Sequence, residues 1–117
     1  MHTVKVPLAG GKTTEIQVTE KIYKIACSLP YGHRFYFVTD TGEEIPIAKL
    51  AQKRARPDGI ANAALLMQKA LSGMIPKRKP ISVTLLENGL FLVLDGNSTV
   101  TIARMASWPA VWCKRKP

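Results

Sequence analysis

The sequence predicts an α+β fold, a small mixed sheet with two or three short helices, preceded by a segment that contains a β-hairpin. Two observations predict this class. Stretches of alternating apolar and polar residues, typical of strands, are interspersed with stretches of helical periodicity, and turns rich in glycine, proline and asparagine separate them. Of the 117 residues, 46% are hydrophobic, which is enough to bury the core of one domain with a small N-terminal appendage.

Residues 1–44 are expected to form this appendage, an N-terminal hairpin and short helix packed on the core. Apolar and polar residues alternate on both sides of a glycine-rich turn at residues 9–12. Thr19 can cap a helix whose apolar residues recur at helical spacing. Aromatic and β-branched residues dominate residues 33–39, which predicts a strand that ends in a turn at residues 40–42.

Residues 45–117 are expected to form the main domain. A short extended segment and a basic loop at residues 53–57 lead into a helix over residues 58–71, with one apolar face. Residues 81–94 predict a hairpin about an Asn-Gly pair, whose two-residue turn requires positive φ at both central positions. A further helix and a final strand at residues 110–113 complete the order.

Neither the histidines nor the cysteines form a catalytic or metal-binding pattern. Cys27 and Cys113 lie far apart without a C-x-x-C spacing, so they predict small buried side chains and no metal site. His33 has no identifiable carboxylate partner, and we interpret it as a structural histidine. Asp95 is the only carboxylate placed for metal or proton chemistry, as a candidate catalytic residue or as a helix cap.

The stretch from Asp95 to Thr99 is the most informative motif, since it leads from a strand into a helix whose first turn can hold an anion. Gly96 permits a sharp turn, and Asn97 or Ser98 can cap the helix. The next backbone amides have no helical acceptor, so they present free donors at the positive end of the helix dipole, which suits a phosphate. The alternative is a structural turn that binds nothing. The predicted phosphate or nucleotide site comprises Gly96, Asn97, Ser98, Thr99 and Arg104, with Arg54 or Arg56 as further counter-charges.

The net charge of +9 belongs entirely to the second part of the chain. Residues 1–44 carry five cationic and five acidic side chains, whereas residues 45–117 carry twelve and three. Clustered Lys and Arg with a pI near 9.9 favour a polyanionic partner. The cations expected to bind nucleic acid are Lys53, Arg54, Arg56, Lys77, Arg78, Lys79, Lys114, Arg115 and Lys116.

The order of elements resembles the N-terminal domain of ParB partition proteins and its structural relative sulfiredoxin. The resemblance covers residues 45–113. It rests on segments similar to family motifs: IPIAKL at residues 45–50, ARP at 55–57, PISV at 80–83, LDGNST at 94–99 and WPAV at 108–111. The resemblance implies the ParB/sulfiredoxin-like fold and a phosphate-gripping turn at LDGNST.

Departures from the family limit the chemistry that the resemblance implies. Ser98 and Thr99 stand where the family commonly has His-Arg or Arg-Arg, so both positions are neutral here. Asn97 aligns with the catalytic cysteine of sulfiredoxins, which excludes a sulfinic-acid reductase. No helix-turn-helix follows, which argues against operator-specific DNA recognition.

Three functions remain open. The favoured one is a small basic ParB-like domain that binds nucleic acid through the phosphate backbone with little sequence specificity. The second is a nucleotide-binding phosphotransferase, NTPase or nuclease of this fold, whose only expected cofactor is a nucleotide. The third is an interaction protein from a mobile element such as a plasmid or phage, which docks on a host protein through Tyr31, Trp108 and Trp112.

No membrane partner is expected, because no run of about 18 apolar residues occurs. The N-terminus also lacks the apolar core of a signal peptide. These observations predict a cytoplasmic protein.

Overall fold

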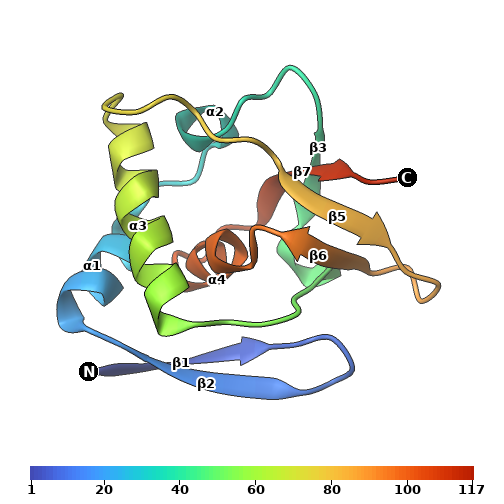
Figure 1. Ribbon diagram of the computed structural model, residues 1–117, viewed down its shortest axis with the longest axis horizontal. Helices are drawn as coiled ribbons and strands as arrows, with labels where there is room; N and C mark the ends of the chain where they lie inside the picture. Colours follow the sequence, from blue (N-terminus) through green and yellow to red (C-terminus); the bar gives the residue numbers. More distant parts are fainter.

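The computed structural model describes all residues, Met1–Pro117, and confirms the predicted α+β fold. The main sheet consists of β3 (Glu43–Pro46), β4 (Leu50–Ala51), β5 (Ile81–Leu85), β6 (Phe91–Asp95) and β7 (Ala110–Arg115). The other elements are the strands β1 (His2–Pro7) and β2 (Thr13–Val18), the helices α1 (Glu20–Ser28), α2 (His33–Tyr36), α3 (Pro57–Leu71) and α4 (Asn97–Met105), and the 3₁₀ turn η1 (Ile47–Lys49). In Figure 1, α4 lies next to the strands and α3 lies beyond α4.

The main sheet has the order β3-β7-β5-β6-β4 and mixes parallel with antiparallel pairs. β4 runs parallel to β6, with Ala51 opposite Leu92, so the segments that follow these two strands leave the same edge of the sheet. β5 runs antiparallel to β6, which brings the residues before β5 to that edge as well. Three segments far apart in sequence therefore meet where β6 ends.

The N-terminal hairpin and short helix form as expected. β1 and β2 pair antiparallel as a separate two-stranded sheet, with Val4 opposite Ile16. Thr19 caps α1, since its hydroxyl oxygen accepts a hydrogen bond from the Ile22 amide at 3.3 Å. The hairpin also contacts the main domain, because the Ala9 amide donates to the Gln52 carbonyl at 2.7 Å.

A single hydrophobic core joins this segment to the main domain. The hairpin and α1 bury side chains in the same cluster as the sheet, α3 and α4. Representative fully buried members are Val6, Ala26, Ile60, Val93 and Ile102. No helix combines the length and the apolar character that crossing a bilayer requires.

The predicted strand at residues 33–39 is wrong. Residues 33–36 form the short helix α2, and Phe37 makes only an isolated parallel bridge with Arg78. Consecutive strand residues face opposite sides, yet Tyr36 and Phe37 are both buried. The Tyr36 hydroxyl donates to the Pro30 carbonyl at 2.7 Å, and its ring packs 5.0 Å from that of Trp108. These tertiary contacts override the β propensity of the aromatic run.

The β5–β6 hairpin is present, but its predicted two-residue turn is wrong. Gly89 has a φ of +84°, whereas Asn88 does not have a positive φ. The Gly89 amide donates to the Leu86 carbonyl at 3.0 Å, and the Leu86 amide donates to the Leu90 carbonyl at 2.8 Å. The connection is therefore a three-residue loop with glycine in the left-handed position, the next commonest hairpin type.

Candidate anion-binding site and cationic groove

The first turn of α4 presents free backbone donors. Gly96 precedes the helix with a φ of +103°, and its carbonyl accepts the first helical hydrogen bond from Val100 at 3.0 Å. Because they lie in the first turn, the amides of Asn97, Ser98 and Thr99 have no intrahelical acceptor. No side chain caps the helix either. These unpartnered donors lie at the positive end of the helix dipole, as the sequence predicted.

The predicted side-chain cap is absent because Asn97 serves a different purpose. The capping position is Gly96, which has no side chain to offer. The Asn97 carboxamide is buried, and its oxygen accepts a hydrogen bond from the Lys53 amide at 2.9 Å. Its nitrogen donates to the Val93 carbonyl at 3.4 Å. Asn97 thus fastens the loop after β4 to the start of α4.

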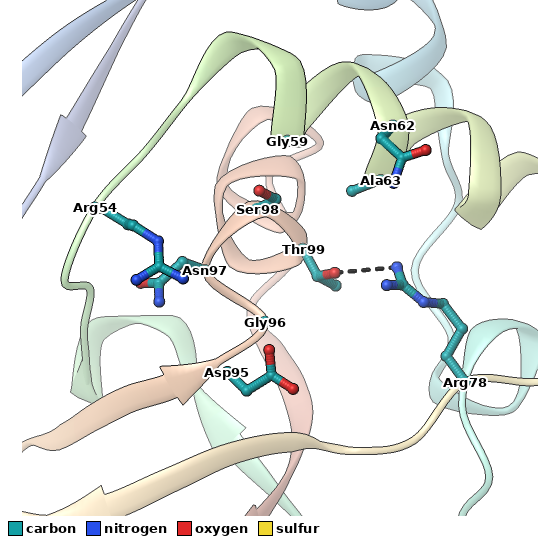
Figure 2. A pocket seen from close by; sticks show the side chains of 10 residues that line it. All are labelled: Arg54, Gly59, Asn62, Ala63, Arg78, Asp95, Gly96, Asn97, Ser98 and Thr99. Carbon is teal, nitrogen blue, oxygen red and sulfur yellow. Dashed lines mark hydrogen bonds between the residues drawn. The ribbon is translucent and has the colours of Figure 1, made fainter.

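A cavity of about 210 Å³ lies over these amides (Figure 2). Its walls come from the loop after β4, the first turns of α3, the segment before β5 and the start of α4. Only one of its ten lining residues is hydrophobic. The lining residues are Arg54, Gly59, Asn62, Ala63, Arg78, Asp95, Gly96, Asn97, Ser98 and Thr99. A polar, partly open cavity at a helix N-terminus suits a small anion.

Two arginines flank the cavity from opposite sides (Figure 2). Arg54 is exposed, whereas Arg78 is half-buried and donates to the Thr99 hydroxyl at 3.2 Å. Burial lowers the pKa of the Arg78 guanidinium, and the charge of Asp95 partly opposes this effect. Arg78 has no ion-pair partner within the chain. An anion in the cavity would therefore give this partly desolvated cation a direct ion-pair partner.

Arg104, predicted as a counter-charge, does not line the cavity. Its guanidinium donates from Nε to Gln52 Oε1 at 2.7 Å and from Nη2 to the Leu50 carbonyl at 3.1 Å. Gln52 is fully buried and donates in turn to the Asn97 carbonyl and the Thr101 hydroxyl. Arg104 is thus part of an internal polar network that holds β4 against α4, and it is absent from the lining of the predicted phosphate site. The other proposed counter-charge, Arg56, lies outside the lining as well.

Four residues that line this cavity were not predicted to lie there, namely Gly59, Asn62, Ala63 and Arg78. Arg78 was predicted to bind the phosphate backbone of nucleic acid but not to line this pocket. Nothing in the local sequence shows that the segment before β5 reaches α4. Gly59 lies so close to α4 that a Cβ at this position would be 2.5 Å from Ser98 Oγ. The only indication of this close approach in the sequence was a glycine near the start of the predicted helix.

Two further cavities extend from the first one. A cavity of about 400 Å³ shares Arg78, Asp95, Gly96 and Thr99 with the first and adds Lys77 and Lys79. A cavity of about 480 Å³ shares Lys79 and Pro80 with the second. Its remaining cations are Lys114, Arg115 and Lys116. We call the three cavities together the groove, the first being its helix end and the third its tail end.

The groove contains seven of the nine predicted nucleic-acid-binding cations, and Lys53 and Arg56 lie outside it. Three of the seven make polar contacts within the protein, namely Arg78 (with Thr99), Lys77 and Arg115. Lys77 Nζ donates to the Phe35 and Ala70 carbonyls at 2.8 and 2.6 Å. Arg115 pairs with Glu43 at 2.9 Å and lies over the Phe91 ring. The six groove cations without an ion pair are Arg54, Lys77, Arg78, Lys79, Lys114 and Lys116.

Asp95 is the only acidic residue in the lining of the groove. Its side chain is exposed and makes no hydrogen bond with the rest of the protein, so the alternative that it caps α4 is wrong. Its carboxylate borders the first two cavities beneath Gly96 (Figure 2). No group of three or more His, Cys, Asp and Glu residues comes together to hold a metal ion.

His33 does have a carboxylate partner, contrary to the sequence interpretation. Its Nε2 lies 3.4 Å from Glu44 Oε1 and 3.2 Å from the Tyr31 hydroxyl, which donates to the same carboxylate. The hydrogen bond from Tyr31 and then the contact with His33 hold the pKa of Glu44 below its ordinary value. The same hydrogen bond to Glu44 raises the pKa of Tyr31 to about 12. This cluster lies outside the groove.

The aromatic residues proposed as protein anchors are mostly engaged internally. Trp108 is buried and its indole N–H donates to the Leu29 carbonyl at 2.9 Å. Trp112 donates to the Thr41 carbonyl at 2.8 Å. The two cysteines differ: Cys113 is buried, as expected, whereas Cys27 is only partly buried.

No protein family, curated protein or solved structure matches this chain. The fold and the site therefore define its class by themselves: an α+β domain with a cationic groove that ends on the free amides of a helix. The likeness to ParB and sulfiredoxin domains remains a resemblance of sequence motifs.

Proposed function

We propose that this chain is a small basic ParB-like domain that binds nucleic acid through the phosphate backbone, with little sequence specificity. The observation that carries the proposal is the row of three adjacent cavities, in which six cations have no ion-pair partner in the protein. Such a row matches the repeating charge of a phosphate backbone. Backbone contacts position a protein on nucleic acid without identifying its sequence.

The helix end supplies the best-defined phosphate position. Three free amides of α4 converge with the guanidinium of Arg78, a combination of dipole and full charge that favours a phosphate oxygen. Ser98 and Thr99 add hydroxyls but no charge. We therefore expect an isolated phosphate to bind weakly, at about millimolar concentration.

Salt-dependent binding tests this proposal. Labelled single-stranded and duplex DNA are titrated at 50, 100 and 200 mM salt, each with and without nucleoside triphosphates. Affinity that falls steeply with salt and needs no nucleotide supports the proposal. Binding that is absent at every salt concentration would overturn it.

A second candidate function is a nucleotide-binding phosphotransferase, NTPase or nuclease. The observation that favours it is Asp95, a carboxylate without a protein partner beside the phosphate position. One carboxylate is a small ligand set for hydrolytic metal chemistry. Turnover of nucleoside triphosphate or DNA in the same titrations, lost in Asp95→Asn, would replace the first proposal with this one.

A further inference from the structure

We infer that the groove binds a single strand of nucleic acid in preference to a duplex, an inference that rests on the proposed function. The three cavities are adjacent, and each neighbouring pair shares lining residues. A concave cationic path that follows the backbone is the arrangement by which proteins hold single strands. Many duplex-binding proteins instead insert a helix or a two-stranded ribbon into the major groove, which is about 12 Å wide.

Neither long helix has the surface of a duplex-binding element. α4 buries six of its nine residues, and its one cation, Arg104, donates hydrogen bonds to β4 and Gln52. α3 has one cation, Lys69, which lies in the last turn and outside the groove. The groove cations lie on connecting segments and on the C-terminal end of β7. The protein therefore has no protruding basic helix that could enter the major groove of a duplex.

The middle and tail end of the groove are held in place by backbone hydrogen bonds. The Arg78 amide donates to the Tyr36 carbonyl at 2.7 Å, and the Val38 amide donates to the Arg78 carbonyl at 2.8 Å. At the tail end, the Lys116 amide donates to the Val83 carbonyl at 2.7 Å. The path along which a strand would lie is therefore already formed.

The tail end also offers a surface on which a base can stack. The Arg115 guanidinium lies 4.8 Å from the centre of the Phe91 ring, and its side chain remains 50% exposed. Unpaired bases stack on guanidinium planes as well as on aromatic rings. Bases within a duplex are already stacked on each other, so only an unpaired base can use this surface.

The test compares strands of one sequence. The full chain is titrated by fluorescence anisotropy with a labelled 12-nucleotide DNA, the same sequence as RNA, and the corresponding 12-base-pair duplex. We expect at least one of the single strands to bind about tenfold more tightly than the duplex. For three to five phosphate contacts, the slope of log affinity against log salt should be about −2 to −3.5.

The triple variant Lys79→Gln, Lys114→Gln, Lys116→Gln tests whether the strand binds in the groove. All three lysines are exposed and free of ion pairs, so the variant should keep its fold, which circular dichroism verifies. The single-strand slope should flatten by about 2. The matched control Lys12→Gln, Lys21→Gln removes exposed cations that line none of the three cavities and should change the slope by less than half as much.

Three results separate the inference from the proposed function. Equal or tighter binding of the duplex would overturn the single-strand preference and leave phosphate-backbone binding intact. A single-strand slope that the triple variant does not change would place the strand outside the groove and overturn the inference. Absence of salt-sensitive binding to every probe would overturn the proposed function itself.

Discussion

The two ends of the groove hold their cations in different ways. At the helix end, Arg78 is half-buried against Thr99, and the free amides of α4 are fixed by Gly96 and by the buried side chain of Asn97. At the tail end, Lys114 and Lys116 are exposed and make no ion pair. The helix end therefore depends on geometry, whereas the two exposed lysines of the tail end act through charge alone. Substitutions and salt should therefore affect them unequally.

The largest expected effect is at Gly96. Alanine there must adopt a φ of +103°, and its Cβ would lie 2.9 Å from the Ile81 side chain. Strain and overpacking together should lower the free energy of unfolding by about 2–4 kcal/mol. Urea denaturation measures the change.

Gly89 provides the matched control for Gly96. It has a φ of +84°, but a Cβ there would have no neighbour within 4 Å. Gly89→Ala should therefore cost only the backbone strain, about 1–2 kcal/mol. Equal losses at the two glycines would show that the contact with Ile81 does not fix the helix end.

The internal network behind the helix end gives the second prediction. Gln52→Leu leaves the Arg104 Nε without its acceptor and removes the donor to the Asn97 carbonyl. Because these groups are buried or partly buried, the variant should lose about 2–3 kcal/mol of stability. Thermal and urea unfolding measure this loss. A stability equal to that of the parent would mean that the network does not support α4.

The third prediction contrasts the two ends in binding. Arg78→Gln should weaken binding of a single strand by about tenfold, because a half-buried guanidinium forms strong charge-assisted hydrogen bonds with phosphate. Lys116→Gln should weaken it by about twofold, since an exposed cation is screened by solvent and salt. Anisotropy titrations at one salt concentration measure both. If Lys116→Gln had the larger effect, the tail end would be the principal contact.

The smallest expected effect lies outside both ends, at Glu44. Contacts with Tyr31 and His33 lower the pKa of this carboxyl in the folded protein. Its contribution to stability is therefore present above its unfolded pKa and is lost as the pH falls through the folded pKa. Glu44→Gln should unfold with less dependence on pH in the acid range and bind phosphate unchanged. Urea midpoints at neutral and acid pH measure this, and an unaltered acid dependence would contradict it.

The sequence predicts the fold largely because its elements are locally specified. The Thr19 cap, the alternating residues of β1 and β2, and the glycine before α4 each determine their conformation through near neighbours. The helical segment at residues 33–36 and the pairing of His33 with Glu44 depend on distant contacts, so propensity and local pattern fail there.

The candidate site divides in the same way. The turn from Gly96 to Thr99 is visible in sequence, because it needs only a glycine and the start of a helix. The cation beside it is not visible, since Arg78 reaches the site through the antiparallel pairing of β5 with β6. Arg104 is closer in sequence, but the buried acceptor on Gln52 draws it away from the turn.

NMR titration with inorganic phosphate, ATP and CTP shows directly whether the first turn of α4 holds a phosphate. The amides of Asn97, Ser98 and Thr99 should shift most, together with the side chain of Arg78, and saturate at about millimolar concentration. Shifts confined to residues 77–79 and 114–117, with Gly96 to Thr99 unmoved, would contradict phosphate binding there and leave the turn with a structural role only.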